Sequence, residues 1–501
     1  MTARNGTTEV GERRRLSVAT VLVALALAGV ASVLIHPAGA HPPSPSLAAA
    51  ADGLPGARST AWFCAGPLPV GTPGEASSIA IANGGASPVA ATVTIVAAEG
   101  APVTEEISIP ASDESVVGLP HRPSATSVAA RVVVDGTGVE VAELVHGALG
   151  PDASPCVEQM TGTQYLAAGS TAARNDVVLA LYDPGATPAV ANVSFATPTG
   201  PASPPAFQGV LVAAGHVVVL DVAHSLPFRS SLAATVRSSG GALVAGALDV
   251  VENRGVELEA LEIPVAKPAT RWFFPAAPAG ASARQTFDLL NPGRRPAEIE
   301  IGLDGPGGVG HIALSLAPGA TLRYAPAPDE SAAAVRWASV SATNKVPIVA
   351  VRELLVASPV SVPAPRVRSA AARRRRALHQ LPLLPVGFTL TSGVTEPATH
   401  WVLPGGQSDA HVSEFVTVAN PSAGPATVWI RPMRGSFAGM APLRVAAHGS
   451  LVVDLAELPT AAGLFALRVT SDVAVVAGGE LYVRGPRGSP GLAAAAAFGL
   501  G

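Results

Sequence analysis

The sequence predicts an all-β protein, with four tandem immunoglobulin-like β-sandwich repeats of about 100 residues after one N-terminal transmembrane helix. Three observations predict this architecture. Apolar residues alternate with a period of two, turn residues separate the short apolar runs, and one set of landmarks recurs four times in a fixed order. The 51 glycines and 47 prolines are typical of many short strands joined by turns.

Each repeat opens with an aromatic residue and reaches an Asn or Asp turn about twenty residues later. In the turn that begins Asn291-Pro292-Gly293, proline presets φ and glycine accepts a positive φ. An apolar strand beside a glycine or polar turn follows, and a pair of apolar runs closes the repeat. The four aromatic residues are Trp62, Tyr165, Trp272 and Trp401, and the four turn residues are Asn83, Asp183, Asn291 and Asn420.

The apolar runs have the pattern of β-strands. Apolar and polar residues alternate in VTIVAAEG and EEISI, which predicts half-buried strands, whereas VVVLDV and VPIVAV are continuous and predict fully buried ones. About seven such runs per repeat favour a sandwich of two sheets. The Cys–Trp–Cys signature of true immunoglobulin domains is missing, so the prediction concerns architecture only. Recurrence of the aromatic residues at one position favours packing in the core over an exposed carbohydrate-stacking platform.

The landmarks define the predicted domain boundaries. In chain order these are a cytoplasmic N-terminus (1–15), a membrane anchor (16–35), a Pro/Ala/Ser-rich stalk (36–60), repeat 1 (61–157), repeat 2 (160–256), repeat 3 (268–357), an Arg-rich linker (358–396), repeat 4 (397–486) and a flexible tail (487–501).

The predicted anchor is an uncharged apolar segment, Leu16 to Ile35, preceded by Arg13, Arg14 and Arg15. A helix of that length spans about 30 Å, the thickness of the hydrocarbon core of a bilayer. The arginines hold the N-terminus in the cytoplasm, so the protein is predicted to be single-pass in the plasma membrane with its bulk extracytoplasmic. Cleavage after Ala40 is the alternative, and it would release a secreted protein.

The chain has two cysteines, Cys64 and Cys156, both on the predicted outer side. In an oxidising compartment they most simply form one disulfide that ties the start of repeat 1 to the segment just past its end. A metal site would need more soft ligands, and a redox pair would be a short Cys-x-x-Cys.

Three features together resemble an uncharacterised actinobacterial family, the one of domain of unknown function 5719: the anchor, the Trp62-Phe63-Cys64 opening, and the N-P-G…P-A and V-A…E-L units. The resemblance extends over nearly all of the predicted outer part. It implies a membrane-associated extracytoplasmic protein without an assigned activity, and no catalytic residue is carried over from it.

Charge and motifs exclude several function classes. The net charge of −4 leaves no basic footprint over a domain, so no nucleic acid is expected as a partner. No metalloprotease, nucleophile-elbow or phosphate-loop motif is present, and no cofactor or metal is predicted.

Glu143, Glu353 and Glu480 occupy the same place in the last apolar run of their repeats, with Asp249 nearby in repeat 2. A strand-end or interdomain polar contact is the favoured interpretation, because no further Asp or Asn surrounds them to complete a calcium site.

Six arginines cluster in the predicted linker: Arg366, Arg368, Arg373, Arg374, Arg375 and Arg376. They form either a solvated interdomain loop or an arm that grips an anionic wall polymer, phospholipid headgroups or an acidic protein surface.

The sequence as a whole predicts a non-enzymatic, membrane-anchored scaffold, spacer or interaction module of the cell envelope, with an unidentified envelope protein or wall polymer as partner. The alternative is a wall-polymer or carbohydrate-binding protein that uses the Arg-rich segment or grooves between repeats. An envelope enzyme with an interdomain site is the third possibility.

Overall fold

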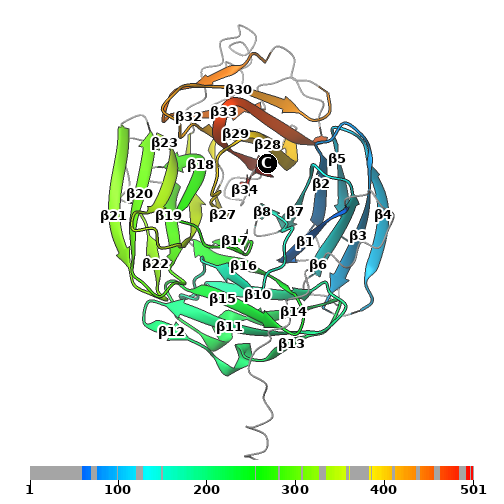
Figure 1. Cartoon of the computed structure of the whole chain (residues 1–501), viewed down its shortest axis with the longest axis vertical. Coiled ribbons are helices and arrows are strands. Elements are labelled where there is room, and N and C mark those ends of the chain that lie inside the picture. Colours follow the sequence, from blue (N-terminus) through cyan, green and yellow to red (C-terminus); the bar gives the residue numbers. More distant parts are fainter. Residues whose placement is uncertain are drawn as a thin grey trace, which may run out of the picture. The chain divides into compact units, whose positions relative to one another are not determined.

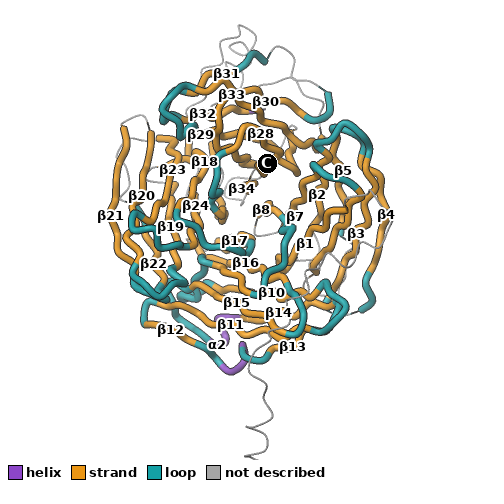
Figure 2. Tube along the Cα trace, in the orientation of Figure 1, coloured by secondary structure: helices purple, strands orange, loops and turns teal. Residues whose placement is uncertain are grey.

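The computed structural model describes 59–68, 76–98, 100–119, 128–147, 150–253, 256–279, 283–305, 308–326, 334–356, 360–361, 383–384, 386–408, 412–435, 440–455, 463–483, 492–496 and 498–499. Most of these residues form β-strands (Figure 2). Neighbouring strands pair antiparallel. The prediction of an all-β chain is confirmed. No helix in this part of the chain is long and apolar enough to cross a membrane, and the predicted anchor, 16–35, lies outside the described residues.

The strands form four successive two-sheet modules, which we number 1 to 4. Module 1 (59–155) contains one sheet in the order β1-β6-β3-β4 and a second in the order β5-β2-β7-β8. Its strands are β1 (Ser59–Leu68), β2 (Ala76–Asn83), β3 (Val89–Ala97), β4 (Val103–Ile109), β5 (Asp113–Gly118), β6 (Val128–Asp135), β7 (Val139–Gly147) and β8 (Gly150–Pro155).

Module 2 (163–262) repeats this strand order. Its sheets are β9-β15-β11-β12, with β13 also on β11, and β14-β10-β16-β17. The elements are β9 (Thr163–Leu166), β10 (Asp176–Asp183), β11 (Ala189–Thr197), β12 (Gly200–Ala202), η2 (Pro205–Phe207), β13 (Val210–Val212), β14 (His216–Asp221), α2 (Val222–Ser225), β15 (Ala233–Ser239), β16 (Val244–Asn253) and β17 (Val256–Glu262). The Asp221 side chain caps α2 by accepting from the backbone N–H of His224.

Module 3 (271–392) has the sheets β18-β23-β20-β21 and β22-β19-β24-β27. Its strands are β18 (Arg271–Ala279), β19 (Ala283–Leu290), β20 (Ala297–Gly305), β21 (Gly308–Leu316), β22 (Thr321–Tyr324), β23 (Ala334–Ala342), β24 (Val349–Val356), β25 (Val360–Ser361), β26 (Leu383–Leu384) and β27 (Gly387–Ser392). The predicted linker boundary is corrected here. Strand β27 lies within 358–396, yet it pairs with β24 along its whole length and completes the second sheet of module 3.

In module 4 (398–499) one long strand, β33, serves both sheets. Its first half pairs with β28 and β30, and its second half pairs with β29 and β34. The strands are β28 (Ala398–Ser408), β29 (Val412–Ala419), β30 (Ala426–Pro432), β31 (Leu443–Val445), β32 (Ser450–Asp454), β33 (Gly463–Val483), β34 (Leu492–Ala496) and β35 (Phe498–Gly499). The segment 487–501, predicted to be a flexible tail, thus contains two paired strands.

The recurring Asn turn joins two loops in modules 1, 3 and 4. In module 3 the fully buried Asn291 accepts from the N–H of Gly293 at 3.0 Å and donates to the carbonyls of Arg295 and Leu316 at 2.8 and 3.0 Å. Asn83 and Asn420 make the equivalent bonds. The side chain therefore ties the turn before the third strand to the loop after the fourth, which explains why the chain repeats it.

Apolar side chains fill the space between the two sheets of each module. In module 1 this core includes Trp62, Ile79, Val93 and Val132, together with both cysteines. Trp62, Trp272 and Trp401 are buried, as the core interpretation of the aromatic residues predicts, whereas Tyr165 is half-buried. Two of the indoles donate to backbone carbonyls, since an N–H buried in a core needs a partner.

The modules also pack on one another. The last strands of their second sheets, β8, β17, β27 and β34, which we call the inner strands, form a closed circuit: β8 lies against β17, β17 against β27, β27 against β34 and β34 against β8 (Figure 1). Farther out, the first sheet of each module packs on the second sheet of the next. Phe63 and Ala129 of module 1, for example, share an apolar cluster with Tyr182 and Val244 of module 2.

The circuit closes between module 4 and module 1. Val402, Met433 and Ala466 pack against Ala82. Two hydrogen bonds cross the same interface. The N–H of Gly405 donates to Glu114 Oε2 at 2.7 Å. Arg468 Nη2 donates to the carbonyl oxygen of Gly84 at 2.6 Å. Segments more than 280 residues apart in the chain are therefore in contact.

Candidate functional site

Buried acidic side chains are the feature most relevant to chemistry. Within the described ranges the buried Asp and Glu residues far outnumber the buried Arg and Lys, of which Arg352 is the sole example. A buried carboxyl group must be hydrogen-bonded, paired or protonated, because an isolated charge in the interior is very unfavourable. The buried acids are Glu140, Glu143, Asp152, Asp183, Asp249, Glu259, Glu262, Asp288, Glu353, Glu414, Asp454 and Glu480.

The prediction that Glu143, Glu353 and Glu480 share one strand position is wrong. Counted from the Asn turn, Glu353 and Glu480 are equivalent, whereas Glu143 is one residue nearer to the turn and corresponds to Arg352. A one-residue offset turns a side chain to the other face of a sheet. Glu143 consequently lies inside its module, and Glu353 faces module 2.

Glu143 lies beside the predicted disulfide, which the structure contains. Cys64 and Cys156 are bonded, with their Cα atoms 4.6 Å apart, and a Glu143 oxygen lies within 4.8 Å of both sulfurs. Glu143 Oε2 accepts from the N–H of Gly66 at 3.3 Å. A Cβ added at Gly66 would come within 2.5 Å of Glu143 Oε1, so glycine permits this approach. Burial raises the pKa of Glu143 to about 8.

Other buried acids bind backbone amides in the same way. Glu262 on β17 accepts from the N–H groups of Ala167 and Ala168, at 2.6 and 3.0 Å, where the chain leaves β9. Asp152 on β8 accepts from the N–H of Leu261 at 2.5 Å and so joins two inner strands. Burial raises the pKa of Glu262 and of Asp152 well above the ordinary range. These side chains satisfy amides that the sheets leave unpaired.

A charged centre lies between modules 2 and 3. Arg323 donates to both oxygens of Asp288, at 2.8 and 3.3 Å, and its Nη2 is 3.0 Å from Glu353 Oε2. Arg323 Nη1 also reaches the carbonyl oxygen of Ser230 in module 2, at 3.3 Å. Burial raises the pKa of Asp249, which faces this centre, to about 8, although the Arg323 charge opposes the shift. The centre holds two modules together, and its groups pair with one another.

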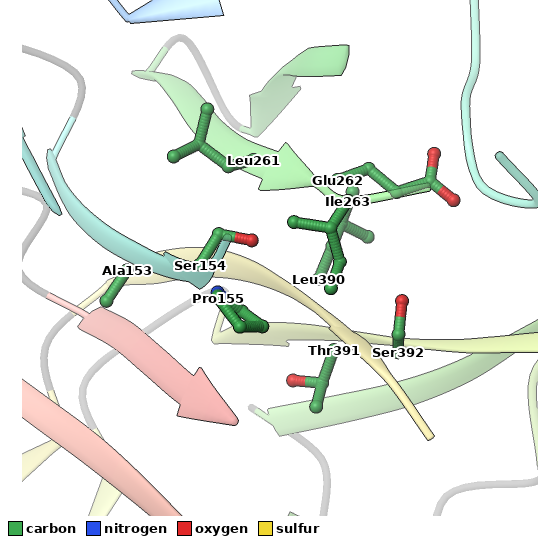
Figure 3. Close-up of a pocket in the computed structure, with 9 residues that line it drawn as sticks. All are labelled: Ala153, Ser154, Pro155, Leu261, Glu262, Ile263, Leu390, Thr391 and Ser392. Atoms are coloured by element: carbon green, nitrogen blue, oxygen red, sulfur yellow. The ribbon is translucent and has the colours of Figure 1, made fainter. Parts of the chain in front are cut away.

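A small polar cavity lies among three inner strands, β8, β17 and β27 (Figure 3). Ser154, Glu262, Thr391 and Ser392 contribute its polar lining. Its volume is about 10 Å³, close to the space needed for one water molecule. Glu262 Oε2 and Ser392 Oγ are buried there without a protein hydrogen-bond partner. The cavity therefore suits a bridging water and is too small for a substrate.

In the part of the chain that the structure describes, one set of three side chains is close enough together to be considered as a metal site. Cys64, Cys156 and Glu143 are the only His, Cys, Asp or Glu residues found there whose ligand atoms converge in threes. The two sulfurs are bonded to each other, so neither is available as a thiolate ligand.

The six arginines of the predicted anionic-polymer contact, Arg366, Arg368 and Arg373 to Arg376, lie outside the described residues. Both ends of their segment are described, however. Strands β25 and β26 pair through Val360 with Leu384 and Ser361 with Leu383. The arginines therefore belong to an insertion between β24 and β27, inside module 3, and do not link modules 3 and 4.

Fold and site together define a β-rich protein whose two-sheet modules are joined by buried polar contacts. Residues 146–357, from β7 to just past β24, match a family model described as a family of unknown function, DUF5719, which confirms the predicted resemblance over that span. No curated protein matches the chain. A crystal structure of a tetra-tandem repeat in the extending region of a large adhesion protein is 10% identical and covers 84% of this chain and 93% of that chain. The TM-score is 0.10, too low to indicate a shared fold.

Sequence reasoning missed the centre formed by Arg323, Asp288 and Glu353. A signal was present, since Arg323 and Asp288 each interrupt an apolar run, and a charge in a buried strand calls for a partner. The pairing itself needs the register of β19 on β22, which places Asp288 opposite Arg323.

Proposed function

We propose that the protein is a non-enzymatic scaffold or interaction module, made of four immunoglobulin-like β-sandwiches and held at the outer face of the plasma membrane by residues 16–35. The closed circuit of module contacts is the observation that carries this proposal. A scaffold must hold its surfaces in a fixed relation, and contacts that return from the last module to the first resist bending at every joint. The disulfide adds support, because disulfides persist in oxidising compartments.

Co-purification from membranes tests the scaffold role. Full-length protein carrying an affinity tag would be cross-linked in living cells, extracted in detergent and examined by mass spectrometry. We expect one reproducible set of envelope proteins. Recovery of only the tagged chain, at a cross-linker dose that captures a known envelope complex, would contradict the proposal.

A reporter that is active only outside the cytoplasm tests the location. Fused at the C-terminus, it should be active, and activity should be lost when Arg13, Arg14 and Arg15 are replaced by glutamate, since these charges set the orientation. Activity in the membrane fraction favours the anchor, whereas activity in the medium favours cleavage after Ala40. An inactive but full-length fusion would show that the location is wrong.

A second candidate function is binding of an anionic wall polymer through the arginine insertion. The paired base of β25 and β26 favours it, because this base holds both ends of the six-arginine segment on module 3. Purified peptidoglycan and arabinogalactan should retain the full-length protein at low salt and release it at high salt. Replacing Arg373 to Arg376 by glutamine should abolish retention. Equal retention of wild type and variant would exclude the arginines as the contact.

A further inference from the structure

An open cleft lies where module 1 passes into module 2. It has a volume of about 770 Å³, within the range of small-molecule sites. The start of β1, the turn before β7 and the segment after β8 form one side, and Gln164 and Pro264 of module 2 form the other. None of the inter-module contacts described above uses this space.

Glu140, on β7, lines this cleft and is only 7% exposed. Its Oε2 atom is buried and has no hydrogen-bond partner in the protein. Burial and, to a smaller extent, the neighbouring carboxylate of Glu158 raise the pKa of Glu140 to about 8. A carboxyl group in this position is unfavourable for the fold.

The other three modules show what the fold alone requires at this position. Glu140 pairs with the residue just before Asn83, and the residues in the same register are Val244, Val349 and Val476. All three valines are buried, and each packs in an apolar cluster shared with the preceding module. Valine is therefore compatible with the fold at this position. Module 1 differs from the others in having a carboxyl group there, that of Glu140, which borders the cleft.

The remaining polar groups of the lining indicate the charge of a ligand. Glu158 supplies a second carboxylate, and no Arg, Lys or His of the described residues lines the cleft. The amide of Gln164 is already used, because its Nε2 donates to the carbonyl of Leu243 at 2.5 Å and its Oε1 accepts from the N–H of Ala245 at 2.9 Å. The carboxylates of Glu140 and Glu158 are thus the charged groups that a ligand can meet, beside the neutral side chains of Thr137 and Gln159.

A metal ion fits the lining poorly. Calcium requires six to eight oxygen ligands, and no three carboxylate or imidazole ligand atoms converge at Glu140 among the described residues. The volume far exceeds that of a bare ion, and Val139, Val157 and Pro264 give the walls apolar surface suited to carbon chains.

We propose that this cleft is a binding site for a small organic cation that carries protonated amines, with one ammonium group against Glu140 and a second near Glu158. The ammonium group pairs with the Glu140 carboxylate, and the carbon chain covers the apolar wall. This site is independent of the scaffold role.

The experiment uses the full-length protein in detergent, with 1,4-diaminobutane as the probe and 1,4-butanediol as its neutral analogue. Calorimetry should detect binding of the diamine and not of the diol. Glu140→Val should weaken binding at least tenfold and leave the fold intact, because valine occupies this register in the other modules. Glu106→Gln, on exposed β4, is the matched control and should bind as wild type.

The pH dependence of diamine binding adds a measurement that unfolding of a variant would not reproduce. Since the bound form requires the Glu140 carboxylate, affinity should rise more than about tenfold between pH 6.5 and pH 9, while the amines stay protonated. In Glu140→Gln this rise should disappear. Undiminished binding by Glu140→Val, equal binding of the diol, or no binding of the diamine at millimolar concentration would each overturn the proposal. So would Glu140-dependent binding of a neutral sugar such as glucose.

Discussion

At the scale of single residues, Asp183 is the exception among the four turn residues. Like the Asn residues of the other modules it is fully buried, and its Oδ1 accepts from the N–H of Gly185 at 2.8 Å. Its Oδ2 has no partner, whereas asparagine carries at that position an amide that donates to backbone carbonyls. Burial raises the pKa of Asp183 above its ordinary value.

Asp183→Asn should stabilise the protein by about 1–2 kcal/mol at neutral pH, because the amide replaces an unsatisfied carboxyl oxygen with a donor. The folded pKa is raised, so the contribution of Asp183 is fully present below its unfolded pKa and is lost as pH rises through the folded value. The gain from the substitution should therefore be larger at pH 8 than at pH 4. Chemical denaturation of both proteins at the two pH values measures it, and a destabilised variant would contradict this reading of the turn.

The reverse change, Asn291→Asp, is the matched control. It removes the donor to Arg295 and Leu316 and should cost about 1–3 kcal/mol at neutral pH. The four turns were predictable from an Asn or Asp followed directly by Pro or Gly. Their tie to a second loop was not, since the carbonyls that accept from Asn291 and Asn83 include residues 25 and 26 positions later in the chain.

At the scale of elements, the disulfide fastens β1 to the segment that follows β8. It closes a loop with a sequence separation of 92. The chain-entropy model gives a stabilisation of about 4 kcal/mol for a loop of this length. Cys64→Ser with Cys156→Ser should therefore lower the free energy of unfolding by up to about that amount.

Denaturation with and without a reductant checks this prediction. Wild type should lose stability in the reductant, and the double variant should be unaffected. An equal effect of the reductant on both proteins would show that the disulfide is not its target.

Strand existence was easier to predict than strand register. The apolar period of two located most strands, but a slip of one residue separates Glu143 from Glu353, and apolar runs do not resolve it. Strand β27 was missed because the arginine insertion separates it from β24, whereas β7 and β8 follow each other closely. Glu140 was missed because it differs from Val244, Val349 and Val476 only once the ladders are aligned.

At the scale of the whole molecule, buried carboxyl groups make stability depend on pH. Burial raises the pKa values of both Glu143 and Asp249 to about 8, far above those of exposed carboxyls. The folded protein therefore holds protons that the unfolded chain releases. Their contribution to stability is complete below about pH 4, declines as pH rises, and is lost through about pH 8.

Thermal unfolding should show a midpoint that falls between pH 6 and pH 9. Glu143→Gln, which stays neutral and keeps an acceptor for the N–H of Gly66, should make this fall smaller. A midpoint that rises over the same range, or an identical fall in the variant, would show that these carboxyl groups are ionised in the folded protein.

The closed circuit of modules is the central structural claim, and small-angle X-ray scattering of the compact unit Ala57–Gly501 tests it most directly. A compact body of this length has a radius of gyration of about 22 Å, and four separate modules in a row would give roughly 40 Å. The contacts of Ala82 with Val402 and of Glu114 with Gly405 predict a value near the smaller figure. A value near the larger one would show that the first and last modules do not meet.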